Sequence, residues 1–244
     1  MPDHERKGSR SAGLDQAQIR QLAPARSGKV RAALGLLRIL IRVRLYDVAG
    51  SPNCKKVRVL ARELGLALEL VPVELLQARE LQYLGWNPTG KVPTLVDDDG
   101  FILWESGAIL LYLAERYHGP IPSDPRARAD MHRWLFFAAT HIQPWLSLLG
   151  QERILKARSG QPADVALVAL AERELSRFLP VLDAQLANQQ FLVRSFSLAD
   201  IAVGCGLENC EARGVTLPIH VTAWRERLRA RPSWSETANA PDAP

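Results

Sequence analysis

The stretch Ser51-Pro52-Asn53-Cys54 holds a hydroxyl, an amide and a thiol, all of which could act on a thiol group. Its spacing matches a Cys-x-x-Cys redox motif with serine in place of the first cysteine. A free thiol has a pKa of about 8.5, so a site that needs a thiolate must stabilise the anion. A hydroxyl beside the unpaired N–H groups of a helix start can do this. The stretch is therefore either a redox pair that has lost a cysteine or a site for a thiol that a ligand brings.

The residues around Ser51 predict a β-α-β unit. β-Branched and aromatic residues at 43–49 favour a strand. Apolar residues recur at helical spacing over 53–64, with Gly65 as the C-cap, and 68–75 predicts a second strand. This order favours two parallel strands with a right-handed crossover. Ser51 would then stand immediately before the helix.

Residues 87–117 predict a strand, a turn at "DDDG", a second strand and a helix, which gives the order β-α-β-(α)-β-β-α. The proline-rich residues 120–126 predict a linker, in which Asp124 caps the next helix. Beyond Pro125 the pattern is helical only, over about 126–158, 162–187, 198–212 and 219–230. Pro144 is expected to kink the first of these helices.

The charge of the chain is concentrated at one end. Residues 1–42 hold nine Lys/Arg and three Asp/Glu, whereas the other 202 residues hold 22 and 23. A nearly neutral body argues against nucleic-acid binding, which needs a basic face on the folded part. The chain also lacks an apolar run near the ~20 residues of a membrane span.

Residues 1–42 predict a basic, disordered extension. Residues 30–42 could form a short basic amphipathic helix, and Arg38 within the apolar segment argues against a secretory signal. Alternatively, the true start lies near Val43.

The three cysteines, Cys54, Cys205 and Cys210, are few and odd in number. This favours a reducing compartment over a disulfide scaffold. The spacing of Cys205 and Cys210 does not fit a zinc knuckle, and no His or Cys pair lies nearby, so no metal site is expected.

Four motifs together resemble the cytosolic glutathione transferases: SPNCKKV (51–57), NPTGKVPTL (87–95), ESGAILLYL (105–113) and SLADIA (197–202). The resemblance covers residues 43 to about 235 and looks closest to bacterial, serine-type members of theta or nu kind. It implies a thioredoxin-like domain at 43–119, an all-helical domain at 127–235 and a tail at 236–244. It also implies glutathione as co-substrate, a homodimer and a cytoplasmic role in detoxification.

By this resemblance, Ser51 is the catalytic residue that stabilises the glutathione thiolate, and the Asn53 amide assists it. The alternative for Ser51 is a helix cap only. Cys54 would fall inside the helix as a buried, inert thiol. Tyr46 is a weaker candidate because its register is one residue off, and such a slip turns a strand side chain to the other face.

The resemblance implies five glutathione-binding residues. Pro93 matches the cis-proline that exposes the Val92 backbone to the cysteinyl part of glutathione as an added strand. Lys91 could meet the glycine carboxylate. Glu105 can pair with the ammonium of glutathione, and Ser106, at a helix start, with the neighbouring carboxylate. Residues 73–88 look shorter than in related transferases, so no residue is assigned to the glycine end.

Trp134, Phe137 and His141 share one face of the first long helix. In this family that helix borders the acceptor pocket and the dimer interface, so the three side chains either line the pocket or belong to the core. Ser197 and Asp200 match a capping box, which we assign to folding.

The predicted function is conjugation of glutathione to an apolar electrophile. Glutathione-dependent reduction of disulfides or peroxides is an alternative that the Ser-Pro-Asn arrangement would suit. A second alternative is a protein-interaction module, although such members tend to lose the glutathione-binding residues that are present here. No nucleic-acid or membrane partner is expected.

Overall fold

The computed structural model describes residues 43–74 and 80–238. The predicted N-terminal extension, residues 75–79 and residues 239–244 lie outside the described part of the chain.

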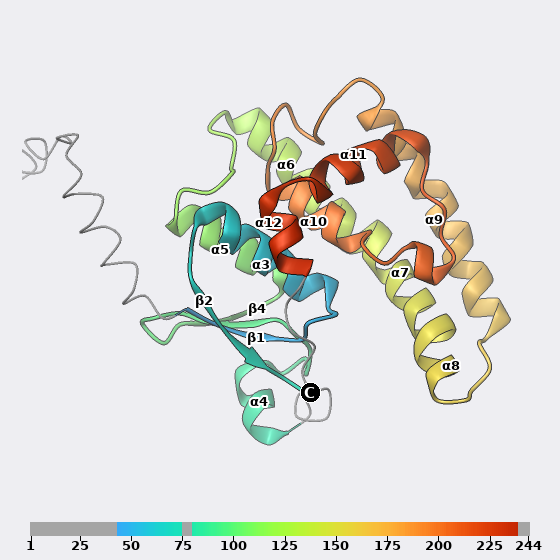
Figure 1. Ribbon diagram of the computed structural model, residues 1–244, viewed down its shortest axis with the longest axis horizontal. Helices are drawn as coiled ribbons and strands as arrows, with labels where there is room; N and C mark the ends of the chain where they lie inside the picture. Colours follow the sequence, from blue (N-terminus) through green and yellow to red (C-terminus); the bar gives the residue numbers. More distant parts are fainter. Residues whose placement is uncertain (1–42, 75–79, 239–244) are drawn as a thin grey trace, which may run out of the picture. The chain divides into compact units, whose positions relative to one another are not determined.

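A four-stranded mixed sheet forms the N-terminal half (Figure 1). Its order is β2-β1-β3-β4, and the strands are β1 (Val43–Asp47), β2 (Leu68–Pro72), β3 (Thr94–Val96) and β4 (Ile102–Trp104). β1 and β2 are parallel and joined by α3 (Pro52–Leu64), as the β-α-β pattern predicts. β3 is antiparallel to both β1 and β4.

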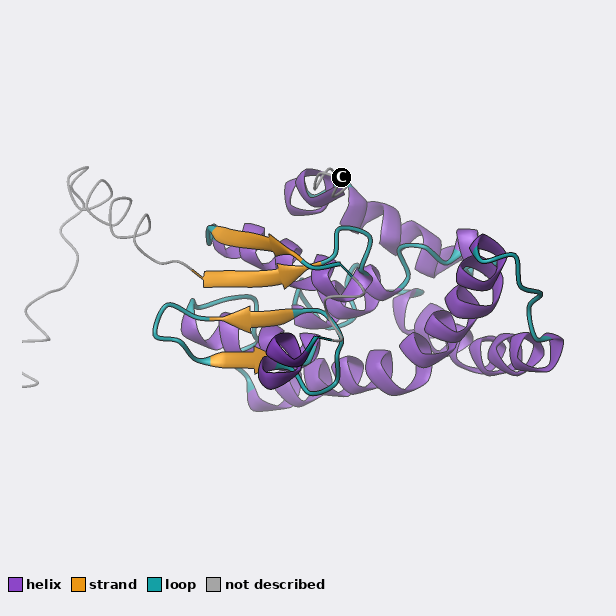
Figure 2. Cartoon of the chain, turned by 90° about the horizontal axis from the view of Figure 1, so that it is seen from below, coloured by secondary structure: helices purple, strands orange, loops and turns teal. Residues whose placement is uncertain are grey.

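Helices cover both faces of this sheet (Figure 2). α3 and α5 (Ser106–Arg116) pack over the face that carries Leu45 and Leu95, in the main hydrophobic core. α4 (Leu81–Trp86) covers the other face, where Tyr83 meets Tyr46 and Val96 in a small second cluster. Leu45 and Tyr46 point to opposite faces because successive side chains of a strand alternate.

Among the described residues, every element after β4 and α5 is helical. These elements are α6 (Pro125–Phe137), α7 (Gln143–Gly150), α8 (Lys156–Arg158), α9 (Val165–Leu186), α10 (Leu198–Gly206), α11 (Ile219–Arg229) and α12 (Pro232–Ala238). The predicted thioredoxin-like domain followed by an all-helical domain is therefore confirmed.

The predicted long helix over 126–158 is present, with two widened turns. π-Helical segments at Ala138–Ile142 and Gln151–Leu155 separate α6, α7 and α8. Pro144 stands in the first turn of α7, directly after the first π segment. Since proline has no N–H to donate to the preceding turn, the irregularity falls just before it, which refines the kink predicted at Pro144.

Two predicted helix caps are confirmed. The Asp124 carboxylate accepts from the N–H of Ala127 at 2.8 Å and opens α6. Ser197 and Asp200 form a reciprocal capping box at α10. Two predictions were wrong in extent: α10 ends at Gly206 rather than near 212, and α12 continues into the predicted tail.

The two halves meet along α3, which packs against α10 and α12. Near the end of α3, Glu63 accepts two hydrogen bonds from Arg231, each 2.9 Å, and one from Ser233 at 2.6 Å. Near its start, Lys55 forms an ion pair with Glu208 at 2.9 Å. These contacts fix both ends of α3 against the helical half. Within the described residues, no helix has both the length and the hydrophobicity that a membrane crossing requires.

Candidate active site

Ser51 stands between β1 and the first turn of α3, where it is the N-cap. Its Oγ accepts from the N–H of Cys54 at 3.3 Å. A capping hydroxyl uses its oxygen as acceptor, so its proton remains a donor for an anion. The first turn of α3 carries no acidic side chain that would neutralise the positive end of the helix. The capping role of Ser51 is thus present and is compatible with binding a thiolate.

Asn53 lies at the centre of a hydrogen-bond network between the two halves. Its Oδ1 accepts from Lys56 Nζ at 2.9 Å, from Ser106 Oγ at 3.4 Å and from Gln143 Nε2. Lys56 also donates to Gln143 Oε1 at 2.9 Å. Because an ammonium group can only donate, the amide oxygen of Asn53 must face Lys56. The amide nitrogen of Asn53 therefore points away and has no hydrogen-bond partner among the described residues.

Cys54 and Tyr46 are both withdrawn from the start of α3. Cys54 is fully buried, and burial, reinforced by the charge of Asp47, raises the pKa of its thiol to about 12. Tyr46 packs on the other face of the sheet, its ring 4.9 Å from that of Trp86. These placements agree with the expectation that neither residue activates the nucleophile.

The loop before β3 holds the predicted cis-proline, since the Val92–Pro93 peptide bond is cis. Lys91, just before it, is exposed, while its carbonyl accepts from Tyr83 Oη at 2.8 Å and from Asn87 Nδ2 at 2.7 Å. The backbone of Val92 has no hydrogen-bond partner among the described residues. It can therefore pair with an extended peptide ligand.

Glu105 and Ser106 form the start of α5, the second helix N-terminus at this site. Glu105 has a φ of 71°, a left-handed conformation that costs energy for a residue other than glycine. The first turn of α5 carries no acidic side chain, and Ser106 reaches Asn53. The hydrogen bond between Asn53 and Ser106 brings the starts of α3 and α5 together, as glutathione binding at both would require.

A cavity of about 230 Å³ opens beside Ser51. It lies between the β1–α3 loop with the start of α3, the turn after α10, and α12. Its lining includes Ser51, Lys55, Arg58, Glu208 and Thr237. Both cations are paired, Lys55 with Glu208 and Arg58 with Asp47. The cavity is thus polar without a strong net charge.

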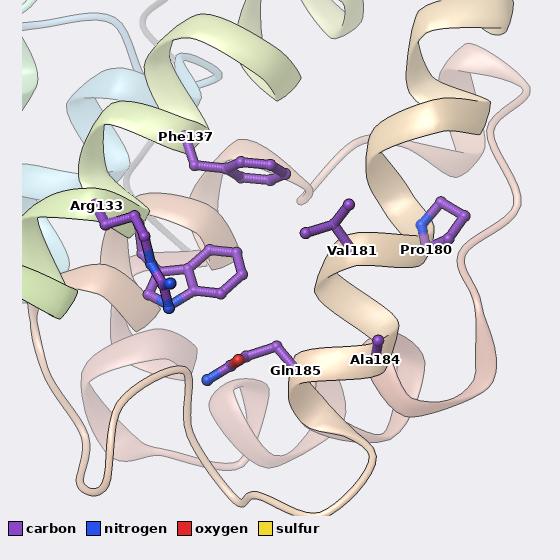
Figure 3. A pocket seen from close by; sticks show the side chains of 7 residues that line it. Arg133, Phe137, Pro180, Val181, Ala184 and Gln185 are labelled. Carbon is purple, nitrogen blue, oxygen red and sulfur yellow. The ribbon is translucent and has the colours of Figure 1, made fainter.

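A larger groove of about 610 Å³ runs between α6 and α9 (Figure 3). Trp134 and Phe137 line it, together with Val181 from the facing helix. His141 does not; its ring stacks on Phe178 with centroids 4.5 Å apart. The groove shares no lining residue with the cavity beside Ser51. The structure therefore brings two of the three predicted acceptor residues into one groove, which is separate from Ser51.

Two residues of this site are not predicted by the sequence, Lys56 and Gln143. Lys56 is 3% exposed although lysine is ordinarily a surface residue. Nothing in the sequence distinguishes it from Lys55, its neighbour. Gln143 lies 90 residues from Asn53 in sequence, so only the tertiary structure reveals the contact.

The fold and the site define a class of protein: a thioredoxin-like domain joined to a helical domain, with two open helix N-termini and an unpaired backbone at Val92. Residues 45–121 match the family described as "Glutathione S-transferase, N-terminal domain". Residues 136–232 match "Glutathione S-transferase, C-terminal domain". The chain belongs to the glutathione S-transferase family, and it is an enzyme that uses glutathione as co-substrate.

Similar proteins of known sequence include glutathione transferases from plants. The chain is 33% identical over 210 residues to glutathione S-transferase 3 of Zea mays, covering 81% of this chain and 94% of that protein. It is 32% identical over 198 residues to glutathione S-transferase F10 of Arabidopsis thaliana, covering 76% and 92%.

Two of the similar solved structures contain glutathione compounds. A glutathione transferase of Pseudomonas putida with bound glutathione disulfide has a TM-score of 0.75 at 27% identity, covering 82% of this chain and 92% of that one. Ure2p5 of Phanerochaete chrysosporium, cocrystallised with 1-(S-glutathionyl)-2,4-dinitrobenzene, has a TM-score of 0.70 at 28% identity, covering 80% and 92%.

Proposed function

We propose that the enzyme is a serine-type transferase in which Ser51, assisted by Asn53, holds the glutathione thiolate for attack on an electrophilic small molecule. The observation that carries this proposal is the placement of the Ser51 hydroxyl at the start of α3, beside a cavity and without an acidic residue in the first turn. The thiol loses its proton to water, the thiolate forms a bond to the electrophilic carbon, and the leaving group departs with its electron pair.

The remaining binding residues are each assigned to one part of glutathione. The Val92 backbone pairs with the cysteinyl unit next to Pro93, and Lys91 reaches toward the glycine carboxylate. Glu105 takes the ammonium, and Ser106 with the N–H groups of α5 takes the neighbouring carboxylate. Support comes from the free backbone of Val92 and from the absence of an acidic side chain in the first turn of α5.

The electrophile must reach the sulfur, so we place it in the cavity beside Ser51. This proposal replaces the acceptor role predicted for Trp134, Phe137 and His141, whose groove shares no lining residue with that cavity. Paired charges line the cavity, so electrophiles with polar substituents should be accepted as well as apolar ones.

The first test is the substitution Ser51→Ala, which should lower kcat/KM for a chloronitrobenzene acceptor by about 100-fold, a loss typical of removing one donor to a developing anion. Ser51→Thr keeps a hydroxyl and should retain most of the activity. Cys54→Ala is the matched control in the same turn. Full activity in Ser51→Ala combined with loss in Cys54→Ala would reject the assignment.

Glutathione-dependent disulfide reduction remains the second candidate, favoured by a glutathione disulfide in the similar Pseudomonas putida structure. The buried Cys54 makes a protein disulfide step unfavourable, so reduction would rely on two glutathione molecules. Turnover of a mixed disulfide, measured beside conjugation for the wild type and Ser51→Ala, separates the two reactions.

We also propose a homodimer. The groove between α6 and α9 contains Val181, which is 47% exposed, and Phe136, next in sequence to the groove residue Phe137, is 71% exposed. A second apolar patch, Ile102 and Trp104, lies on one face of the edge strand β4, where each residue is 36% exposed. In a two-fold dimer each patch of one copy can cover the other patch of its partner.

A cytoplasmic location fits this assignment. All three cysteines are free and buried, which suits a reducing compartment.

A further inference from the structure

Three neighbouring cations on α3, Lys55, Lys56 and Arg58, are all buried but are neutralised differently. Lys55 and Arg58 form ion pairs with Glu208 and Asp47. Lys56 forms no ion pair with a carboxylate among the described residues. Its ammonium is held instead by two neutral amide oxygens, those of Asn53 and Gln143. A buried cation of this kind is unfavourable unless a nearby negative charge compensates it.

The hydrogen bonds that Asn53 accepts indicate on which side of Asn53 this negative charge would lie. Lys56 and Gln143 both bind the same atom, Asn53 Oδ1, and so hold the amide oxygen on their side. The amide nitrogen of Asn53 is then turned away from Lys56 and has no hydrogen-bond partner among the described residues, and Asn53 itself lies in the helix turn that Ser51 caps. The positive charge of Lys56 therefore lies one side chain behind the group proposed to meet the sulfur.

We propose that Lys56 is a positioning residue for the transferase reaction, which orients the Asn53 amide toward the glutathione sulfur and favours the thiolate through its positive charge. The inference rests on the proposed roles of Ser51 and Asn53. Ionisation breaks the S–H bond, releases the proton to water and leaves the electron pair on sulfur. The protein forms no covalent bond in this step.

The other ionisable groups around Lys56 come from two packed elements. Cys205 faces it from α10, and Glu105 faces it from the start of α5. α7 contributes the neutral Gln143. Burial lowers the pKa of Lys56 to about 8, so near neutral pH the side chain is mainly an ammonium, and a nearby thiolate would keep it charged.

The test measures the pKa of the glutathione thiol bound to the enzyme, from the ultraviolet absorbance of the thiolate as a function of pH. In Lys56→Met and Lys56→Gln we expect this pKa to rise by about one unit, so that about tenfold less thiolate is present at a pH below both values. Lys56→Gln keeps a hydrogen-bond donor to Asn53, so a rise in this variant reports on the charge. Lys56→Arg should restore the wild-type value in part.

Two controls separate this effect from a structural one. Affinity for S-methylglutathione, which has no thiol proton, should change less than twofold in Lys56→Met. Arg116→Met removes one positive charge at the opposite end of the sheet, where Arg116 binds Asp97, and should leave the thiol pKa unchanged.

An unchanged thiol pKa in both Lys56→Met and Lys56→Gln would overturn the inference. A loss of S-methylglutathione affinity without a change in the thiol pKa would also overturn it and assign Lys56 to the glutamyl end of the ligand. If Ser51→Ala and Asn53→Ala leave the thiol pKa unchanged as well, the proposed roles of those residues are wrong, and the failure lies there.

Discussion

The side chains at the start of α3 point to two different sides of the helix, because each residue of a helix is rotated by about 100° from the preceding one. Asn53 and Lys56 turn toward α5 and α7, whereas Lys55 and Arg58 turn toward the cavity, Asp47 and Glu208. Ser51 stands between these two directions. Adjacent lysines with the same chemistry therefore have different environments.

The pH dependence of stability should reveal the buried charge of Lys56. Its pKa is lowered from 10.5 to about 8 in the folded protein, so between these values the unfolded chain holds a proton that the folded protein has released. Stability therefore rises with pH through this window. The full rise corresponds to roughly 3 kcal/mol.

Lys56→Met removes the free-energy cost of burying this ammonium group. At pH 7 we therefore expect the variant to be as stable as the wild type or more stable, despite its lower activity. The difference should shrink or reverse by pH 10.5. Urea unfolding at both pH values measures it. Arg116→Met, which removes the cation paired with the buried Asp97, should instead be destabilised at pH 7. An equal destabilisation of both variants would contradict this account of Lys56.

Among the elements, α10 shows how one side chain organises a helix start. The carboxylate of Asp200, which is fully buried, accepts from the N–H of Leu192 and the N–H of Ser197, each at 3.0 Å. It also accepts from Trp224 Nε1 at 3.0 Å, which ties α11 to α10. This is more than the predicted capping box, because Asp200 also joins the loop before α10 and the helix after it.

Asp200→Ala should lower the free energy of unfolding by about 3 kcal/mol, since several buried donors lose their acceptor together. The activity per folded molecule should remain within twofold at low temperature. Urea unfolding and active-site titration check both statements. Asp183→Ala is the matched comparison, because Asp183 caps α11 through the N–H groups of His220 and Val221 but is only half-buried. Equal losses in the two variants would argue against the wider role of Asp200.

At the scale of the whole molecule, the described residues include two exposed apolar patches that a single copy leaves uncovered, the α6–α9 groove with Phe136 and the β4 edge with Trp104. Burial of both in a dimer would remove them from water, and apolar surface of this kind favours association. The proposed active site does not include either patch. Association and catalysis can therefore be tested separately.

Phe136→Asp should shift the protein from dimer to monomer, because a charge would be placed in an apolar contact. Light scattering after size exclusion measures the mass. Val165→Asp is the matched control: Val165 is 80% exposed at the other end of α9 and should not affect assembly. A monomeric wild type, or a Phe136→Asp dimer of unchanged affinity, would reject the proposed interface.

The sequence by itself determined the order of elements, the start of α3 at Ser51, the caps at Asp124 and Ser197, and the family. These features depend on local patterns: strand alternation, helical spacing, turn residues and capping side chains act over a few positions. The position of Ser51 before a helix, in particular, follows from the β-α-β pattern alone.

Only the tertiary structure decided which side chains meet. Lys56 and Lys55 cannot be told apart from the sequence, and their roles diverge because α7 brings Gln143 to Lys56 and the turn after α10 brings Glu208 to Lys55. In the same way, the orientation of α6 places Trp134 and Phe137 in a groove with α9, away from Ser51. Such contacts join residues up to 170 positions apart, as for Ser233 and Glu63, and only the packing of whole helices brings them together.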